Sequence, residues 1–148
     1  MKQTLPIVLI VIAIMLAGCG SGSSNTINGH WTAALMGSGS NGSPVFDFTV
    51  SLAATGSNNL SITNLNFTTA NSCFASGSSA NGGFTLSGNF NGVTSGGFQM
   101  NIQSPPSGGN NLLTLVGTVQ NNSVNGTWTL TGTTAGCTGS GSFTMNKG

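Results

Sequence analysis

The sequence has almost no charge. Its charged side chains are Lys2, Asp47 and Lys147, its one histidine is His30, and it contains no arginine, glutamate or tyrosine. General acid–base pairs, phosphate clamps and basic nucleic-acid surfaces all require such groups. The composition therefore predicts a chain that is not an enzyme, binds no nucleic acid and holds no metal ion or other cofactor.

Small polar residues take the place of the charged ones. Gly, Ser, Thr and Asn make up 55% of the 148 residues, which is the length of one domain. The chain is nevertheless 37% hydrophobic, with eight Phe and two Trp, which is too apolar for a disordered linker. We expect a folded domain whose surface is covered by hydroxyls and amides instead of ions.

The amino terminus has the pattern of an export signal. Lys2 precedes the uncharged run Leu5–Leu16, which would be about 18 Å long as a helix. A helix of that length is too short for a bilayer core of about 30 Å and fits the apolar region of a signal peptide. It ends in Leu16-Ala17-Gly18-Cys19, which resembles the lipobox of bacterial lipoproteins at all four positions.

That resemblance implies a lipid anchor. Residues 1–18 would be removed as the signal peptide, and Cys19 would carry a diacylglycerol and an N-linked acyl chain (palmitate or similar). Gly20 stands where an aspartate would be an inner-membrane retention signal, which favours the outer membrane of the cell envelope, on its periplasmic or surface-exposed face. Residues 19–26 read as a flexible, lipidated tether, and residues 27–148 as one domain.

Two cysteines remain, Cys73 and Cys137. In an exported, oxidising compartment two thiols usually form a disulfide. The alternatives are free thiols or a metal or catalytic role, but there is no CxxC spacing and no histidine with an orienting carboxylate beside them. We therefore predict a structural disulfide.

Short runs of alternating apolar and polar residues fill the domain, with the period of half-buried antiparallel strands. Gly, Asn, Ser and Pro separate them. The runs cover 27–36, 45–54, 59–67, 83–91, 95–103, 111–120, 123–131 and 138–146. The predicted fold class is all-β, an antiparallel up-and-down barrel of about eight strands after a signal-peptide helix; a β-sandwich is the alternative.

One face of these strands is apolar and should form the interior. Its aromatic members, which would form a packed core or line an apolar pocket, are Trp31, Phe48, Phe84, Phe98, Trp128 and Phe143. His30 and Asp47 take the opposite phase and should face solvent. In run 59–67 the phase changes between Ile62 and Leu65, which predicts a bulge near residues 63 and 64. Glycines inside strands, such as Gly88, Gly117 and Gly126, should lie where the barrel bends sharply or where a large ring needs room.

Strand order also places the cysteines. In an up-and-down barrel, Cys73 and Cys137 lie in connections at the same end, and the amino terminus enters at the other. Those connections are on opposite sides of the ring, whereas bridged Cα atoms are only about 4.4–6.8 Å apart. Segments 68–82 and 132–137 must therefore fold inward as a lid over the membrane-distal end.

Two further resemblances concern the fold. Gly29-His30-Trp31 on the first strand resembles the Gly-x-Trp of the calycin barrels, lipocalins and avidins, which implies an eight-stranded barrel with that Trp closing one end. The pentads 28–32 and 125–129, NGHWT and NGTWT, hint at equivalent strand starts in two halves. With this Gly-x-Trp and the C-terminal stretch GTWTLTGTTAGCTGSGSFTMNK, residues 126–147, the chain resembles small Gly/Ser/Thr-rich lipoproteins of environmental bacteria, which implies no particular activity.

These observations lead to a functional expectation with two alternatives. The chain should be an exported lipoprotein that acts as a non-enzymatic structural, binding or adhesive module of the envelope, its membrane contact made through the lipid. The first alternative is a lipocalin-like carrier of a small hydrophobic ligand, which needs an internal cavity above about 300 Å³. The second is a membrane barrel with its apolar face outward, which lacks the expected aromatic belts.

Overall fold

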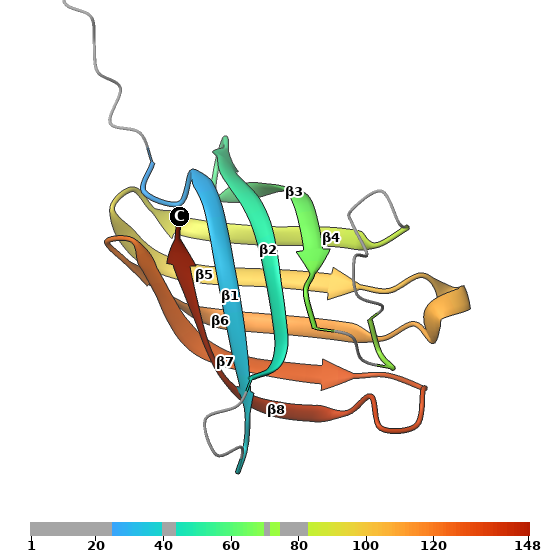
Figure 1. Cartoon of the computed structure of the whole chain (residues 1–148). Coiled ribbons are helices and arrows are strands. Elements are labelled where there is room, and N and C mark those ends of the chain that lie inside the picture. Colours follow the sequence, from blue (N-terminus) through green and yellow to red (C-terminus); the bar gives the residue numbers. More distant parts are fainter. Residues whose placement is uncertain (1–24, 40–43, 70–71, 75–82) are drawn as a thin grey trace, which may run out of the picture.

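The computed structural model describes residues 25–39, 44–69, 72–74 and 83–148. These residues form eight antiparallel strands, each paired with the next, and the first pairs with the last to close a barrel (Figure 1). The predicted barrel is confirmed and the sandwich alternative is wrong. The predicted signal peptide and Cys19 lie outside the described residues. The strands are β1 (Gly29–Gly37), β2 (Pro44–Thr55), β3 (Asn59–Phe67), β4 (Thr85–Gly92), β5 (Ser95–Gln103), β6 (Leu112–Gln120), β7 (Ser123–Thr131) and β8 (Gly139–Lys147).

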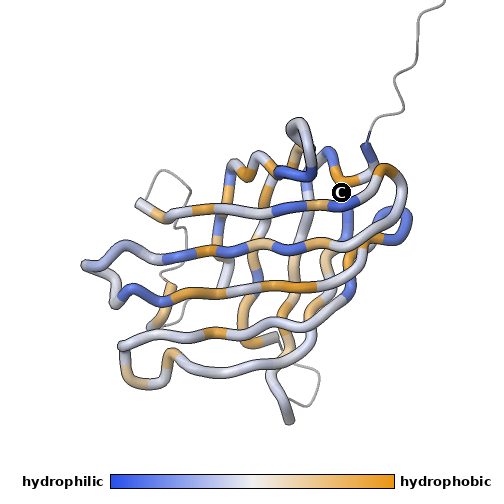
Figure 2. Tube along the Cα trace, turned by 180° about the vertical axis from the view of Figure 1, so that it is seen from behind, coloured by the Kyte–Doolittle hydropathy of each residue, from blue (hydrophilic) through white to orange (hydrophobic). Residues whose placement is uncertain are grey.

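The strands alternate between buried apolar and exposed polar positions, as their sequences predict. Figure 2 shows this as apolar residues recurring at intervals along each strand. The buried apolar residues of the described ranges form one continuous cluster inside the barrel. Their inward direction is the opposite of what a membrane barrel with a lipid-facing apolar surface requires.

Two glycines make room for two phenylalanine rings of the interior. Phe98, Gly117, Gly126 and Phe143 are direct neighbours across β5, β6, β7 and β8. The two phenylalanine rings meet over the glycines with their centroids 6.3 Å apart. A Cβ atom on Gly126 would lie 2.8 Å from the Phe143 ring and would clash with the carbonyl oxygen of Val116. The expectation that strand glycines accommodate rings is confirmed here.

Strand β3 contains the predicted bulge. In the ladder between β2 and β3, Thr49 of β2 pairs with Asn66 of β3. Ser51 of β2 pairs with Thr63 of β3, so β3 has one residue more than β2 over this stretch. Asn64 takes up the extra length with a φ of 53°, in the left-handed region that asparagine tolerates. As a result Leu60 and Leu65, which are out of phase in the sequence, are both buried.

The wall of the barrel is weakest between β3 and β4. Within the described residues, the two strands share one register pair, Asn59 with Asn89, and Phe90 N–H donates to the Asn58 carbonyl at 3.0 Å. The strands diverge beyond that point (Figure 1). Side chains fill the resulting gap, because Phe84 approaches Phe67 with a ring centroid distance of 6.0 Å. The barrel is thus closed here by packing instead of by a ladder of hydrogen bonds.

The chain enters and leaves the barrel at the same end, which we call the tail end (Figure 1). Thr26 N–H donates to the Val93 carbonyl at 2.8 Å, its hydroxyl donates to the Asn121 carbonyl at 2.9 Å, and Lys147 Nζ donates to its carbonyl at 3.1 Å. Ile27 is fully buried beneath these contacts. Asn25 also donates its side-chain amide to the Gly92 carbonyl at 3.2 Å, so the last two residues of the predicted tether are hydrogen-bonded to the barrel.

The two tryptophans lie at different depths in the barrel. Trp31 is near the start of β1 and donates its indole N–H to the Ile27 carbonyl at 2.8 Å, which closes the tail end. Trp128 is near the far end of β7 and donates to the Met36 carbonyl at 2.9 Å. The hint of equivalent strand starts was wrong: the first pentad begins just before β1, and the second begins two residues inside β7.

Candidate functional site

A disulfide joins two connections at the end of the barrel opposite the tail end, which we call the plug end. Cys73 follows β3, Cys137 precedes β8, and their Cα atoms are 5.5 Å apart. Both cysteines are buried, at 7% and 0% exposure. The predicted disulfide is confirmed, together with its place away from the entering chain.

Phe74 follows Cys73 and fills this end of the barrel. It is 2% exposed and stacks on Phe67 with ring centroids 4.7 Å apart and an interplanar angle of 7°. It also contacts Phe46 and Phe84, each at a centroid distance of 6.0 Å. Residues 72–74 therefore fold inward as a plug, and the same aromatic group fills the gap between β3 and β4. Residues 70–71 and 75–82 of the predicted lid lie outside the described residues.

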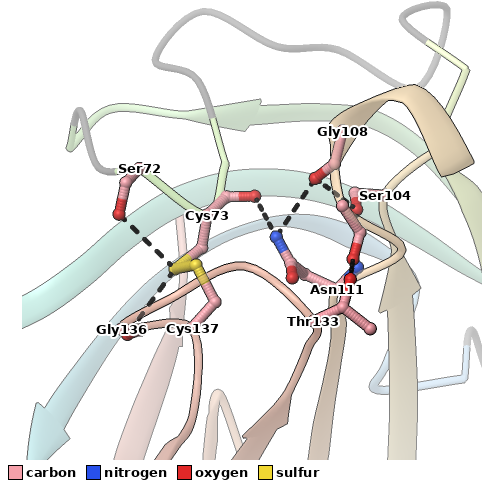
Figure 3. Close-up of a disulfide and its surroundings, with 9 residues drawn as sticks. Ser72, Cys73, Ser104, Gly108, Asn111, Thr133, Gly136 and Cys137 are labelled. Atoms are coloured by element: carbon pink, nitrogen blue, oxygen red, sulfur yellow. Dashed lines mark hydrogen bonds between the residues drawn. A yellow bond between two sulfur atoms is a disulfide. The ribbon is translucent and has the colours of Figure 1, made fainter.

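Asn111 fastens the plug to the connection between β5 and β6 (Figure 3). Its side-chain amide donates to the carbonyls of Cys73 at 3.1 Å and Gly108 at 3.2 Å. Its backbone exchanges hydrogen bonds with Ser104, whose hydroxyl accepts from Asn111 N–H at 2.8 Å. Thr133 closes the set by donating to the Gly109 carbonyl at 2.8 Å. Three connections are thus held together at the plug end.

The sequence did not reveal Asn111. It lies in the stretch SPPSGGNN, which reads as a turn, and nothing there distinguishes a buried asparagine from an exposed one. Ser104 and Asn111 are the buried polar residues of the described chain. Asn111 Oδ1 is buried and accepts no hydrogen bond from a described residue, an arrangement that typically costs about 1–3 kcal/mol. Among the described residues, the plug contacts therefore leave this one acceptor without a donor.

A groove of about 480 Å³ lies where β7, β8 and the end of β1 meet. Its hydroxyl-bearing residues are Ser38, Thr127, Thr129, Ser140 and Ser142, and it is also lined by Gly37, Trp128 and Gly141. Thr127 and Thr129 flank the buried Trp128 and point outward, so the groove is on the outer wall of the barrel. We call it the hydroxyl groove.

Strand register explains the shape of this groove. Thr127 pairs with Ser142 and Thr129 with Ser140, which places two rows of hydroxyls side by side across the strands. Between the rows lie Trp128, Gly141 and Gly37, which are paired with one another and have the inward phase. Residues of inward phase contribute only backbone to the outer wall, so a trough remains between the rows. None of the groove residues can ionise.

The sequence-predicted residues take the following places. Phe48, Phe98, Phe143 and both tryptophans are buried in the core, and Phe84 is half-buried beside it. They therefore lie in or against the continuous apolar cluster of the interior. His30 is exposed, with Nδ1 3.3 Å from Ser51 Oγ, and Asp47 accepts a hydrogen bond from Thr69 at 3.3 Å.

Within the described ranges, no three His, Cys, Asp or Glu side chains are grouped so that they could hold a metal ion. No helix in the described part of the chain is long and apolar enough to cross a membrane. Comparison of the chain with known proteins finds no matching family model, curated protein or solved structure.

Proposed function

We propose that the chain is an exported lipoprotein, held on a membrane of the cell envelope by lipid on Cys19, whose barrel is a non-enzymatic binding or adhesive module. The anchor is supported by the sequence Leu16-Ala17-Gly18-Cys19 after a short apolar run. The chain enters the barrel at the tail end, so an anchor at Cys19 leaves the plug end and the hydroxyl groove directed away from the membrane.

The binding role is supported by one observation, the difference between an apolar interior and a polar, uncharged outer wall. The described interior is one continuous apolar cluster, with Ile27 and Trp31 at the tail end and Phe74 at the plug end. The outer wall presents neutral hydroxyls and amides, and its hydroxyl groove is open to solvent. A module of this form meets its partners on the outer wall.

The same packing bears on the carrier alternative. A carrier would bury most of a small hydrophobic ligand in a cavity lined by apolar side chains. Trp31, Phe48 and Phe67 lie in the barrel interior and are fully buried by neighbouring protein atoms. The packing of the described residues therefore favours the binding module over the carrier.

Replacing Cys19 by Ser tests the anchor. The expected result is loss of the acyl mass from the amino-terminal peptide and release of the protein into the soluble fraction, because serine offers no thiol for a thioether. Ser23→Ala is the matched control and should remain lipidated and membrane-bound. If the Cys19→Ser protein were processed normally and sedimented with membranes to the same extent, the anchor would be refuted.

Replacing Gly20 by Asp tests the address in a cell with two membranes. If the glycine permits sorting to the outer membrane, Gly20→Asp should retain the protein in the inner membrane while leaving its lipid unchanged. Density-gradient separation of the membranes measures this, and an unchanged distribution would refute the outer-membrane assignment alone.

A further inference from the structure

The outer wall around the hydroxyl groove points to a ligand class. Four hydroxyls of the groove make no hydrogen bond to another described residue, so they are available to a ligand. They belong to Thr127, Thr129, Ser140 and Ser142. The Ser38 hydroxyl differs, because it donates to the Ser140 carbonyl at 3.1 Å. Ser38 therefore helps to fix the rim, and the two pairs on β7 and β8 form the contact surface.

The chemistry of these groups excludes strongly ionic ligands. An anion or cation that leaves water needs an opposite charge or several charge-assisted hydrogen bonds. The described chain offers Asp47 and Lys147, but neither lines the groove, and both side chains are engaged by Thr69 and Thr26. A purely apolar ligand would cover the hydroxyls and leave them unpaired.

A neutral ligand that bears hydroxyls needs no charged partner, and it can pair with the hydroxyls of the groove. A Ser or Thr hydroxyl donates one hydrogen bond and accepts others, so it matches a group that does the same. Neighbouring strands place side chains of one face about 4.8 Å apart, and the two rows are two residues apart along each strand. The groove therefore offers a small grid of donors and acceptors on a surface without charge.

The row of Thr129 and Ser140 continues beyond the groove as polar side chains and indicates an extended ligand, whereas Thr127 in the other row pairs with the exposed Val116 of β6. Thr129 pairs with Thr114 on β6, Thr114 with Asn101 on β5, and Asn101 with Ser87 on β4. Each of these residues has the outward phase. A chain molecule that lies across the strands along the Thr129 row would meet one neutral polar side chain per strand, which suits a polymer better than a single small molecule.

We propose that the hydroxyl groove binds neutral glycan chains, with Thr127, Thr129, Ser140 and Ser142 as the contact residues. This inference deepens the proposed binding function and rests on it for its place in the envelope. Binding to a single oligosaccharide should be weak, with a dissociation constant on the order of 1 mM, because the groove is open and each hydrogen bond contributes little net energy. Many copies on one membrane would bind a polymer more strongly.

The test uses the full chain in a detergent without a sugar head group, such as a dimethylamine oxide. Neutral hexasaccharides of glucose and of N-acetylglucosamine are titrated by NMR, with hexagalacturonate and hexaglucosamine as the anionic and cationic probes. At least one neutral probe should bind and shift the amide signals of residues 127–129 and 140–142. The charged probes should bind at least tenfold more weakly.

Matched variants locate the binding site. Ser142→Arg places a long charged side chain in the groove and should weaken binding at least tenfold, whereas Asn146→Arg, on the same exposed face of β8, should not change it. The double variant Thr127→Val and Thr129→Val removes two hydroxyls without adding bulk and should weaken binding about tenfold. Its control is Thr32→Val with Thr118→Val, both exposed and outside the groove.

Three results would overturn the proposal. These are no binding of any neutral probe at tens of millimolar, equal binding of charged and neutral probes, or equal affinity of groove and control variants with unchanged thermal midpoints. None of them concerns the anchor, because the measurement uses purified protein. Failure of the Cys19→Ser experiment and failure of the glycan experiment are therefore distinguishable.

Discussion

Replacing Cys73 and Cys137 together by alanine should lower the free energy of unfolding by about 4 kcal/mol. The two cysteines are 64 residues apart in the sequence, and the bridge limits the conformations of the unfolded chain between them. In the chain-entropy model a loop of this length contributes about 4 kcal/mol at 25 °C. The other plug contacts, Phe74 on Phe67 and Asn111 on the Cys73 carbonyl, remain in the variant.

Urea unfolding of the full chain measures this effect in two ways. The midpoint should fall, and the slope of the free energy against urea concentration should rise, because an unbridged unfolded chain exposes more surface. Phe74→Ala is the comparison, since it keeps the disulfide and removes a buried ring. It should cost about 3–5 kcal/mol and leave the slope unchanged.

The pattern of the two variants decides the argument. If the double cysteine variant lost less than about 1 kcal/mol and its slope did not change, the bridge would not restrict the unfolded chain as the loop length requires. If Phe74→Ala were as stable as the wild type, the ring would not fill the plug end. Either result would refute the account of how this end is closed.

Two further predictions concern the barrel interior. Trp31→Ala and Trp128→Ala should each cost about 3–5 kcal/mol, measured as a shift of the denaturation midpoint, and unchanged midpoints would place these rings at the surface. Gly126→Ala should cost about 3 kcal/mol because its Cβ would clash with the backbone carbonyl of Val116. Gly97→Ala is the control and should be close to neutral, since open space surrounds Gly97. Equal denaturation midpoints for the two glycine variants would contradict the packing around Gly126.

Much of the fold could be predicted because the alternation of apolar and polar residues along a strand indicates which side chains are buried. The bulge of β3 is the clearest case, since Leu60 and Leu65 can share one face only if an extra residue lies between them. The disulfide followed from elimination among three cysteines and from strand order. Both inferences depend on strand phase and order, which the sequence contains.

The features that could not be predicted depend on where strands meet in three dimensions. The single register pair between β3 and β4 is a matter of strand divergence, which the local sequence of Asn59 or Asn89 does not encode. Asn111 is buried only because the plug folds over it. The hydroxyl groove needs the pairing of Thr127 with Ser142, and each of these residues alone looks like an ordinary exposed strand residue.

The short ladder between β3 and β4 has a consequence for how the barrel folds. β1 to β3 and β4 to β8 are two series of antiparallel neighbours, and pairings between neighbours in sequence form faster than pairings between distant segments. The two series meet along a full ladder between β1 and β8, where Trp31 pairs with Lys147, and along one register pair between β3 and β4. Closure of the ring therefore waits for the last strand, and its β3–β4 side gains little backbone energy. The native disulfide joins the end of the first series to the second by a different route, because it runs across the plug end from the residue after β3 to the connection before β8.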